Sequence, residues 1–222
     1  ESSDHPFTLA TAYAGIVSLY VRRGHLHAAI PILERGLELC RSWNLSLWFP
    51  KIASALGEGF ALAGRVAEAV PLLERAVEQS AAMRLMGGHA PVLACLGEAY
   101  LLAGRHDDAS GTAERALALA RDHRERGHEA WALRLQGEIA LRASACPPDA
   151  AIDRLREALT LATKLAMRPL VARCRATLGQ AYHRAGRPAD GREHLSAATA
   201  LLREMGMTLW VGEAEAALAD LQ

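Results

Sequence analysis

The stretch Leu56-Gly57-Glu58-Gly59-Phe60-Ala61-Leu62-Ala63-Gly64-Arg65 carries the pattern that decides the fold, because its outer glycines recur along the chain. Three related tripeptides follow at intervals of forty, forty and forty-two residues: Leu96-Gly97-Glu98, Gln136-Gly137-Glu138 and Leu178-Gly179-Gln180. Seven residues after the first glycine, three copies have a second one: Gly64, Gly104 and Gly186. A fixed period of this length predicts an array of small, similar structural units.

Each copy has the features of two helices joined by a tight turn. Apolar residues recur at spacings of three and four, which is the helical period. The second glycine marks a helix end, because glycine adopts the left-handed conformation without strain. The fourth copy lacks it and has Pro147-Pro148, which favours the start of a helix. We expect Pro31 and Pro71, inside the second helices, to lie near the first turn.

The pattern therefore predicts an all-α superhelical solenoid of five helix–turn–helix repeats closed by one capping helix. We expect a single domain over residues 1–222, and the repeats and the cap at about 6–44, 45–84, 85–124, 125–166, 167–206 and 208–221. The capping helix would cover the core face that an end repeat otherwise exposes. Because the sequence begins at Glu1 and not at Met, we also expect a fragment of a larger protein.

Bulk composition narrows the function classes. The chain has 25 basic and 25 acidic residues, so the basic balance typical of nucleic-acid binders is absent and no direct nucleic-acid partner is expected. No apolar run approaches the length of a membrane span, so no membrane partner is expected either. The four cysteines are scattered without a CxxC motif. Such cysteines suit a reducing compartment, which predicts a cytoplasmic location.

No constellation for catalysis or metal binding is present in the sequence. There is no glycine-rich phosphate loop, HExxH or GxSxG motif, and no cysteine has a plausible neighbouring base. His25 and His27 are two residues apart and would point to different sides of a helix. The sequence therefore predicts a protein that is not an enzyme and that has no cofactor and no metal.

Small and aromatic residues identify the kind of repeat. An aromatic follows the first glycine by three residues, as in Phe60 and Tyr100. Small residues follow it by twelve and nineteen residues: Ala69 and Ala76, Ala109 and Ala116, and Gly191 and Ala198. This pattern resembles the tetratricopeptide repeat consensus over the whole chain. The resemblance implies that the first helices of the repeats line a concave groove, which takes a peptide or a protein partner.

The repeat register then places thirteen candidate groove residues: Ser18, Lys51, Ser54, Glu58, Ala94, Glu98, Trp131, Arg134, Glu138, Arg173, Gln180, His183 and Arg184. The Lys and Asn set with which some members of the family hold a terminal carboxylate is missing. The aligned Glu58, Glu98 and Glu138 have two interpretations. They either form an acidic stripe for a basic or amide-rich partner, or pair with arginines of adjacent helices, which is the interpretation we favour.

Particular stretches resemble one group of bacterial proteins. They are Asn44-Leu45-Ser46-Leu47-Trp48-Phe49-Pro50, Gly127-His128-Glu129-Ala130-Trp131-Ala132-Leu133-Arg134-Leu135 and Arg203-Glu204-Met205-Gly206-Met207-Thr208-Leu209-Trp210. They are similar to the C-terminal tetratricopeptide region of regulators that join an AAA or STAND ATPase to an adenylate or guanylate cyclase or to a LuxR-type domain. The resemblance implies a regulatory sensing module, whose partner is a protein, a peptide or another domain of its parent chain.

Two alternatives stay open at this point. The chain could serve self-association as a homodimer through residues 6–24, or the array could sense a small molecule. Any ATPase or cyclase activity would belong to parent domains, since none of their catalytic motifs lies in these residues.

Overall fold

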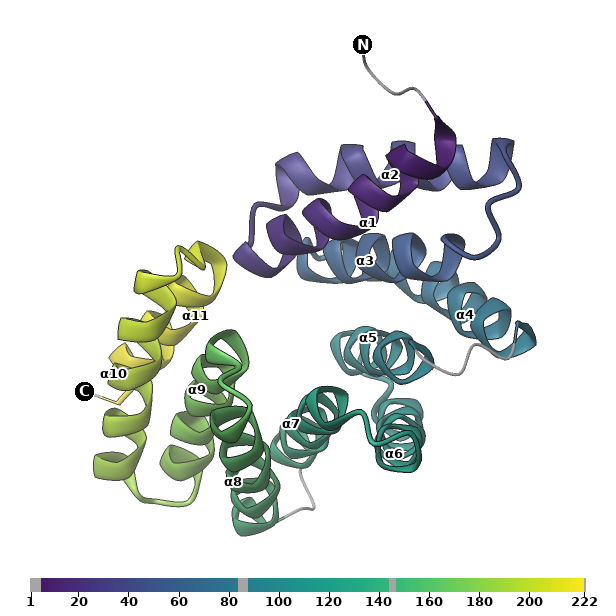
Figure 1. Ribbon diagram of the computed structural model, residues 1–222. Coiled ribbons are helices and arrows are strands. Elements are labelled where there is room, and N and C mark those ends of the chain that lie inside the picture. Colours follow the sequence, from purple (N-terminus) through teal and green to yellow (C-terminus); the bar gives the residue numbers. More distant parts are fainter. Residues whose placement is uncertain (1–4, 84–87, 144–146, 222) are drawn as a thin grey trace. The chain divides into compact units, whose positions relative to one another are not determined.

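The computed structural model describes residues 5–83, 88–143 and 147–221, with the side chains of 16–19 left out (Figure 1). These residues form eleven α-helices and no β-strand. The helices are α1 (Pro6–Arg23), α2 (Leu26–Ser42), α3 (Phe49–Leu62), α4 (Val66–Ala82), α5 (His89–Leu102), α6 (His106–Asp122), α7 (Arg126–Arg142), α8 (Pro148–Lys164), α9 (Arg168–Arg184), α10 (Pro188–Glu204) and α11 (Thr208–Ala219). The all-α class, with five helix pairs and a closing helix, is confirmed.

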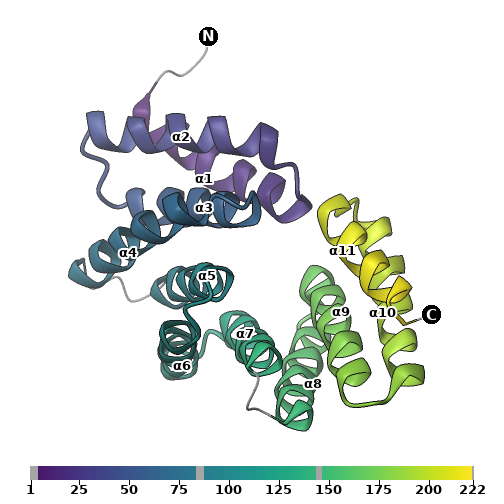
Figure 2. The same cartoon turned by 180° about the vertical axis from the view of Figure 1, so that it is seen from behind.

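The chain divides into two compact units, Glu1–Thr112 and Ala113–Gln222. In the first unit α1 packs on α2 and α3 packs on α4, while α3 also contacts α1 and α5 (Figure 2). In the second unit α7 packs on α8 and α9 packs on α10, while α9 also contacts α7 and α11. Within each unit the first helices of successive repeats are therefore neighbours. Side chains at one register position of these helices can come together.

The first glycine of each repeat lets the paired helices approach closely. A Cβ added to Gly57 would lie 2.5 Å from Cγ of Leu73, and one added to Gly137 would lie 2.5 Å from Cγ of Leu155. Gly179 has the same relation to Leu195. All three leucines are fully buried, as are the small residues Ala69, Ala151 and Ala198. A leucine of the second helix thus fills the space that a side chain would need, which the small-residue pattern alone did not reveal.

The second glycine ends the first helix in a left-handed conformation. Gly64 has a φ of 77°. The following N–H, on Arg65, donates to the carbonyl of Phe60 at 2.8 Å. The Arg65 guanidinium then lies 4.1 Å from the centre of the Phe60 ring and bonds Glu68 at 2.7 Å. The stacked ring and the neighbouring carboxylate both stabilise the cation, so the Gly-Arg pair organises the turn beyond the glycine itself.

The same arrangement recurs at Arg105 on Tyr100 and at Arg187 on Tyr182, with ring distances of 4.2 and 4.5 Å. Tyr100 also donates a hydrogen bond to Glu74 of the preceding α4 at 2.8 Å. The aromatic residue therefore joins one repeat to the repeat before it. Tyr20, in α1, is 40% exposed because no described helix precedes α1.

Three of the turns between repeats use left-handed residues that are not glycine. Asn44, Arg124 and Ala166 have φ values of 51°, 56° and 54°, and Gly206 occupies the corresponding place with a φ of 65°. Met167 donates to the carbonyl of Ala162 at 2.9 Å across one of these turns. Only Gly206 and Asn44 are residue types that commonly adopt this conformation. The sequence pattern therefore gave little indication of these helix ends.

Both internal prolines lie deeper than expected. Pro31 and Pro71 are the sixth residues of α2 and α4, in the second turn, and both helices continue past them. Each ring lies on the exposed side of its helix. The carbonyl that loses its helical hydrogen bond there can be hydrated, which is why the helices are not broken.

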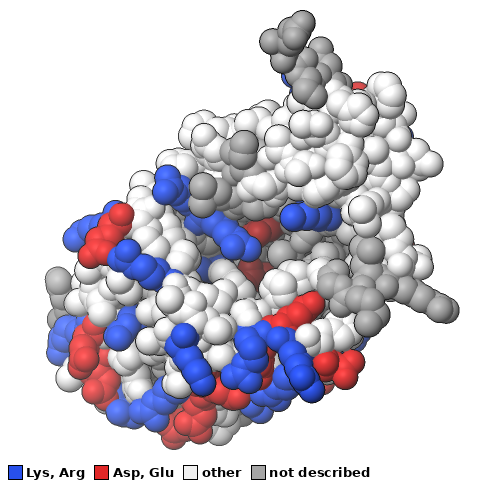
Figure 3. Space-filling view, in the orientation of Figure 1, with Lys and Arg blue, Asp and Glu red and all other residues white. Residues whose placement is uncertain are grey.

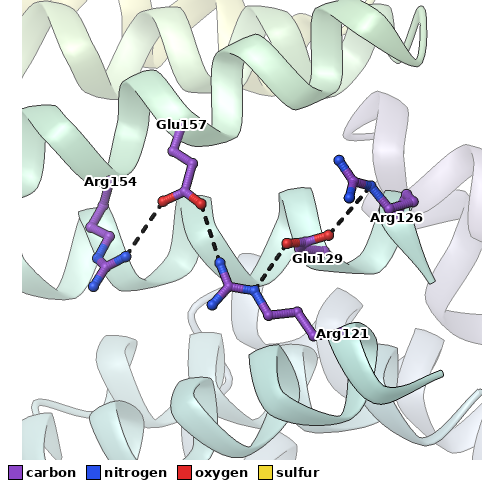
Figure 4. Close-up of polar contacts among 5 residues, drawn as sticks. All are labelled: Arg121, Arg126, Glu129, Arg154 and Glu157. Atoms are coloured by element: carbon purple, nitrogen blue, oxygen red, sulfur yellow. Dashed lines mark hydrogen bonds and ion pairs between the residues drawn. The ribbon is translucent and has the colours of Figure 1, made fainter. Parts of the chain in front are cut away.

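A chain of ion pairs joins three helices of the second unit. Arg121, at the end of α6, contacts Glu129 of α7 at 3.0 Å and Glu157 of α8 at 3.2 Å (Figure 4). Arg126 and Arg154 complete the chain at 3.5 and 3.4 Å. These contacts connect charged side chains of α6, α7 and α8.

Candidate binding site in the second unit

Three charged residues of α7 form the base of the site. Arg134 bonds Glu138 four residues later, and Arg142 bonds the other oxygen of that carboxylate at 2.9 Å. The Arg134 side chain is only 1% exposed and that of Glu138 is 19% exposed. Residues four apart share one side of a helix, so a single helix positions all three groups. Glu138 thus takes its hydrogen bonds from its own helix, and not from an adjacent one as expected.

Arg173 of α9 stands beside this group between two tryptophans. Its guanidinium carbon lies 5.2 Å from the ring centre of Trp131 in α7 and 4.1 Å from that of Trp210 in α11. Arg134 lies 5.5 Å from the Trp131 ring as well. Stacking on aromatic faces limits the rotamers of a long arginine side chain and stabilises its charge. The arrangement holds α7, α9 and α11 together around one cation.

A pocket of about 90 Å³ opens where these helices meet. Its lining residues are Arg134, Glu138, Arg142, Arg173, Ala176, Thr177, Gln180, Leu202, Trp210 and Glu213. Thr177 is buried and donates its hydroxyl to the carbonyl of Arg173 at 3.1 Å. Gln180 and Glu213 are exposed and lie on the solvent side of the lining. The pocket is thus charged, with one aromatic wall.

The two carboxylates of the pocket have opposite pKa shifts. Burial acts to raise the pKa of Glu138, but the positive charges of Arg134, Arg173 and Arg142 outweigh it and the pKa is lowered. Loss of hydration raises the pKa of Glu213, and the nearby charge of Glu138 adds to the rise while Arg173 opposes it. Glu138 is therefore held as an anion, and Glu213 is the weaker acid.

Cys174 and Cys40 are inert parts of the core. Burial raises the pKa of the Cys174 thiol to about 12 and also raises that of Cys40. Both are almost fully buried. A thiol that stays protonated is a poor nucleophile and a poor metal ligand. The fourth cysteine, Cys146, lies outside the described residues.

In the first unit, the candidate positions surround a thiol. Ser54 is buried and forms a hydrogen bond with Cys95. Burial, followed by the charges of Glu58 and Glu98, raises the pKa of Cys95. Both glutamates are half-buried, as is Ala94. The register thus brings Ser54, Glu58, Ala94 and Glu98 to one part of α3 and α5.

The remaining candidate residues lie apart from these groups. Lys51 is exposed, with its ammonium 5.7 Å from the ring centre of Trp48. His183 is exposed, and Arg184 donates to the backbone carbonyl of Leu141 at the end of α7. Ser18 lies in α1, but its side chain is outside the described part of the structure.

Six pocket residues were not among the candidates of the sequence analysis: Arg142, Ala176, Thr177, Leu202, Trp210 and Glu213. Glu213 could have been found, because it continues the register of Trp131 and Arg173 at intervals of forty-two and forty residues into α11. The cap was expected to cover the last repeat, and its contribution to the groove was not considered.

Surface charge differs along the chain. On the face shown in Figure 3, few charged side chains lie over α1 and α2, whereas many lie over α6 and α8. Exposed large apolar side chains are frequent near the beginning: Phe7, Tyr20, Ile32, Trp43 and Leu47. On this face α1 and α2 therefore present a surface with few charges, and α6 and α8 present a charged one.

Neither a metal site nor a membrane-spanning helix is found among the described residues. No group of three or more His, Cys, Asp or Glu side chains there could hold a metal ion. None of the helices in the described ranges combines the length and the apolar character that a bilayer crossing requires.

Comparison with known proteins shows what the repeats are similar to. A tetratricopeptide repeat family model matches residues 60–134. A search of curated proteins finds no match. Among solved structures, the tetratricopeptide-like repeats of a putative kinesin light chain from Podospora anserina are 19% identical, with a TM-score of 0.61 over 91% of this chain and 98% of that one.

Two further solved structures are also similar in fold. A STAND ATPase with a tetratricopeptide repeat sensor, from Pyrococcus horikoshii, is 18% identical with a TM-score of 0.62 over 94% of this chain, which matches 32% of the ATPase. A Rap protein in complex with competence and sporulation factor is 12% identical, with a TM-score of 0.69 over 100% of this chain and 67% of that one. At these identities the likeness concerns the fold.

Proposed function

We propose that this chain, whose residues 60–134 match a tetratricopeptide repeat model, is a protein-interaction and regulatory sensing module that binds a peptide or a protein. The binding surface is the face formed by the first helices of its repeats, and the pocket of the second unit is its centre. The tetratricopeptide fold is typically non-catalytic, and no enzymatic role is part of this proposal.

The observation that carries the proposal is the convergence at the pocket. Arg134, Glu138, Arg173 and Gln180 were selected by repeat register alone, and all four line one pocket. Titratable groups with perturbed pKa values that converge in a cleft mark a candidate functional site. The likeness to a STAND ATPase with a repeat sensor and to a Rap protein with a bound factor supports a regulatory role.

We place the module in a larger, cytoplasmic bacterial signalling protein. The resemblance of the stretches around Trp48, Trp131 and Trp210 to regulators with ATPase, cyclase or LuxR-type domains supports this context. In such a protein the partner could also be another domain of the same chain.

The test is capture of a partner by the immobilised full chain from a lysate of its source. Gln180→Trp places a large side chain at the exposed rim of the pocket. Ser196→Trp makes the same change at an exposed position of α10 outside the pocket. We expect wild type and Ser196→Trp to retain the same partner, and Gln180→Trp to lose it. Equal recovery by all three would contradict binding at this site.

Self-association is the second candidate function. The exposed Phe7, Tyr20 and Trp43 lie in the first repeat and Leu47 follows it, and few charged side chains lie over α1 and α2 on the face shown in Figure 3. Apolar surface gathered in this way marks interaction sites more often than scattered residues do. Sedimentation would show a dimer for wild type and a monomer for Phe7→Ser/Leu47→Ser. A monomer for both chains rejects this function without affecting the first.

A further inference from the structure

We propose that a groove between α2 and α4 binds the apolar face of an amphipathic helix that has carboxylates in its first turn. The groove lies between the second helices of the first two repeats, within the first compact unit. It is therefore a different surface from the one formed by the first helices, and the inference goes beyond the proposed function.

The floor of this α2–α4 groove is apolar. α3 contacts both α2 and α4, and its Leu56 and Phe60 line the groove together with Leu37 of α2 and Leu72 of α4. These four residues are only 2 to 9% exposed, so they lie at the bottom of the groove. The groove has a volume of about 490 Å³, within the range of about 300–1,000 Å³ that ligand sites usually have. Several side chains of a partner can enter it.

The two ends of the groove differ in charge. Glu34 and Glu68 line one end and share Arg65, whose guanidinium lies 3.8 Å from the first carboxylate and 2.7 Å from the second. Arg41 and Arg75 line the groove seven residues further along the same two helices, which is about 10 Å at the helical rise. The groove thus extends over two helical turns, from an acidic end that is partly compensated to a basic end.

The two arginines of the basic end have no carboxylate partner among the described residues. Arg41 and Arg75 are exposed and form no ion pair there, although Glu38 and Glu78 lie three residues away from them on α2 and α4. The Arg75 guanidinium lies 5.8 Å from the ring centre of Phe49, at the start of α3. Because charge complementarity selects the partner and fixes its orientation, this end favours an anionic group.

A helix suits the groove better than an extended peptide does. The walls are α-helices, whose backbone N–H and C=O groups are used within each helix, so there is no sheet edge for an added strand. An amphipathic helix with apolar residues at i, i+3, i+4 and i+7 has an apolar stripe two turns long, which matches the floor. Carboxylates in its first turn also interact favourably with its own dipole. The bound helix therefore begins at the basic end and runs antiparallel to α2 and α4.

The test measures the binding of three peptides to the full chain by fluorescence anisotropy. Each has about sixteen residues and blocked ends, with leucines at i, i+3, i+4 and i+7, so that it has appreciable helix content in water. They differ at two positions of the first turn, which are Glu, Gln or Lys. We expect the Glu peptide to bind about fivefold more tightly than the Gln peptide, because exposed ion pairs contribute up to about 1 kcal/mol, and the Lys peptide to bind no more tightly than the Gln peptide. Circular dichroism of the free peptides corrects for unequal helix content.

A double substitution locates the carboxylates. Arg41→Gln/Arg75→Gln should lower the affinity for the Glu peptide about fivefold, to that for the Gln peptide, and leave the affinity for the Gln peptide unchanged. Arg35→Gln/Arg115→Gln removes the same charge at exposed positions outside the groove and should keep the preference for Glu.

A bulky side chain locates the apolar stripe. Ala67 is an exposed residue of the groove lining, so Ala67→Trp should block all three peptides. Ala81→Trp makes the same change at an exposed position of α4 outside the groove and should bind them as wild type does.

The inference is overturned if the Gln or Lys peptide binds wild type as tightly as the Glu peptide, if none of the three binds, or if the Arg41/Arg75 variant keeps the preference. It is also overturned if sedimentation shows a dimer for wild type and a monomer for Ala67→Trp, because a second copy would then fill the groove. Gln180→Trp should bind the Glu peptide as wild type does. A loss there would assign the peptide to the pocket of the second unit and overturn this inference without affecting the proposed function.

Discussion

The charged side chain of Arg134 is almost fully buried, and its ion pair with Glu138 helps to stabilise it there. A buried guanidinium that loses a carboxylate partner loses part of the compensation of its charge, which is more costly than the loss of an exposed ion pair. The repeat register placed Arg134 in a groove where exposure was expected. Its burial depends on Trp131 and Glu138, which surround it in three dimensions.

Glu138→Gln should therefore destabilise the chain by about 2–3 kcal/mol at neutral pH, somewhat less than for a fully buried pair. Because the folded pKa of Glu138 is lowered, its contribution is complete above the ordinary carboxyl pKa and is lost as the pH falls through the lowered value. The difference between wild type and variant should shrink accordingly in acid. Urea unfolding at several pH values measures it.

Glu157→Gln is the matched control for this prediction. Glu157 contacts Arg121 and Arg154, but all three side chains are about half exposed. Exposed pairs contribute about 0–1 kcal/mol, so the control should lose little stability. Equal losses for the two variants would mean that the burial of Arg134 has no special cost.

The left-handed backbone of Ala166, at the turn between α8 and α9, is strained. The residue is exposed and has a φ of 54°, where an alanine is strained by about 1–2 kcal/mol. Ala166→Gly should therefore stabilise the chain by roughly 1 kcal/mol. The larger conformational entropy of glycine in the unfolded state offsets part of this gain. Gly206→Ala, at the corresponding turn, should destabilise it. Thermal unfolding checks both signs, and a loss of stability in Ala166→Gly would refute the strain.

At the scale of helices, the pairing of α7 with α8 depends on the close approach at Gly137. A Cβ there would lie 2.5 Å from Cγ of Leu155 and 3.3 Å from the carbonyl oxygen of Ala151. Gly137→Ala should overpack the pair and cost about 1–3 kcal/mol. Gly212→Ala meets nothing within 4 Å and should be neutral or stabilising. Partial rescue of Gly137→Ala by Leu155→Ala would confirm the contact, and equal effects of the two glycine variants would refute it.

Sequence periodicity predicted the helices and their pairing because these follow from local spacing. Gly57, Gly64 and their repeats specify which residues touch and where a helix turns back. The repeat bounds fell at Arg124 and Ala166, but their left-handed conformation was not indicated, since these residue types do not favour it. The pocket was predicted in part: Arg173 and Glu138 follow the register, but the contribution of Trp210 depends on how α11 docks on α9, which no spacing in the repeats encodes.

At the scale of the whole molecule, the helix contacts described within each compact unit join near neighbours along the chain. Stability in such an array is close to a sum of local terms, so damage should stay local. In hydrogen exchange, Gly137→Ala should lower protection in α7, α8 and α9 and leave α1 to α4 as in wild type. A uniform loss of protection in both compact units would show one cooperative transition in place of separable ones.

The docking of α11 gives the pocket a thermodynamic connection to the last helix of this chain. Trp210 and Glu213 are pocket residues, so the pocket is complete only while α11 rests on α9 and α10. A ligand that binds this closed form lowers the population of chains with α11 detached by a factor of 1 + [L]/Kd. By reciprocity, any tension or contact that detaches α11 weakens the binding of the ligand by the same free energy. Occupancy of the pocket and docking of α11 would therefore be thermodynamically coupled.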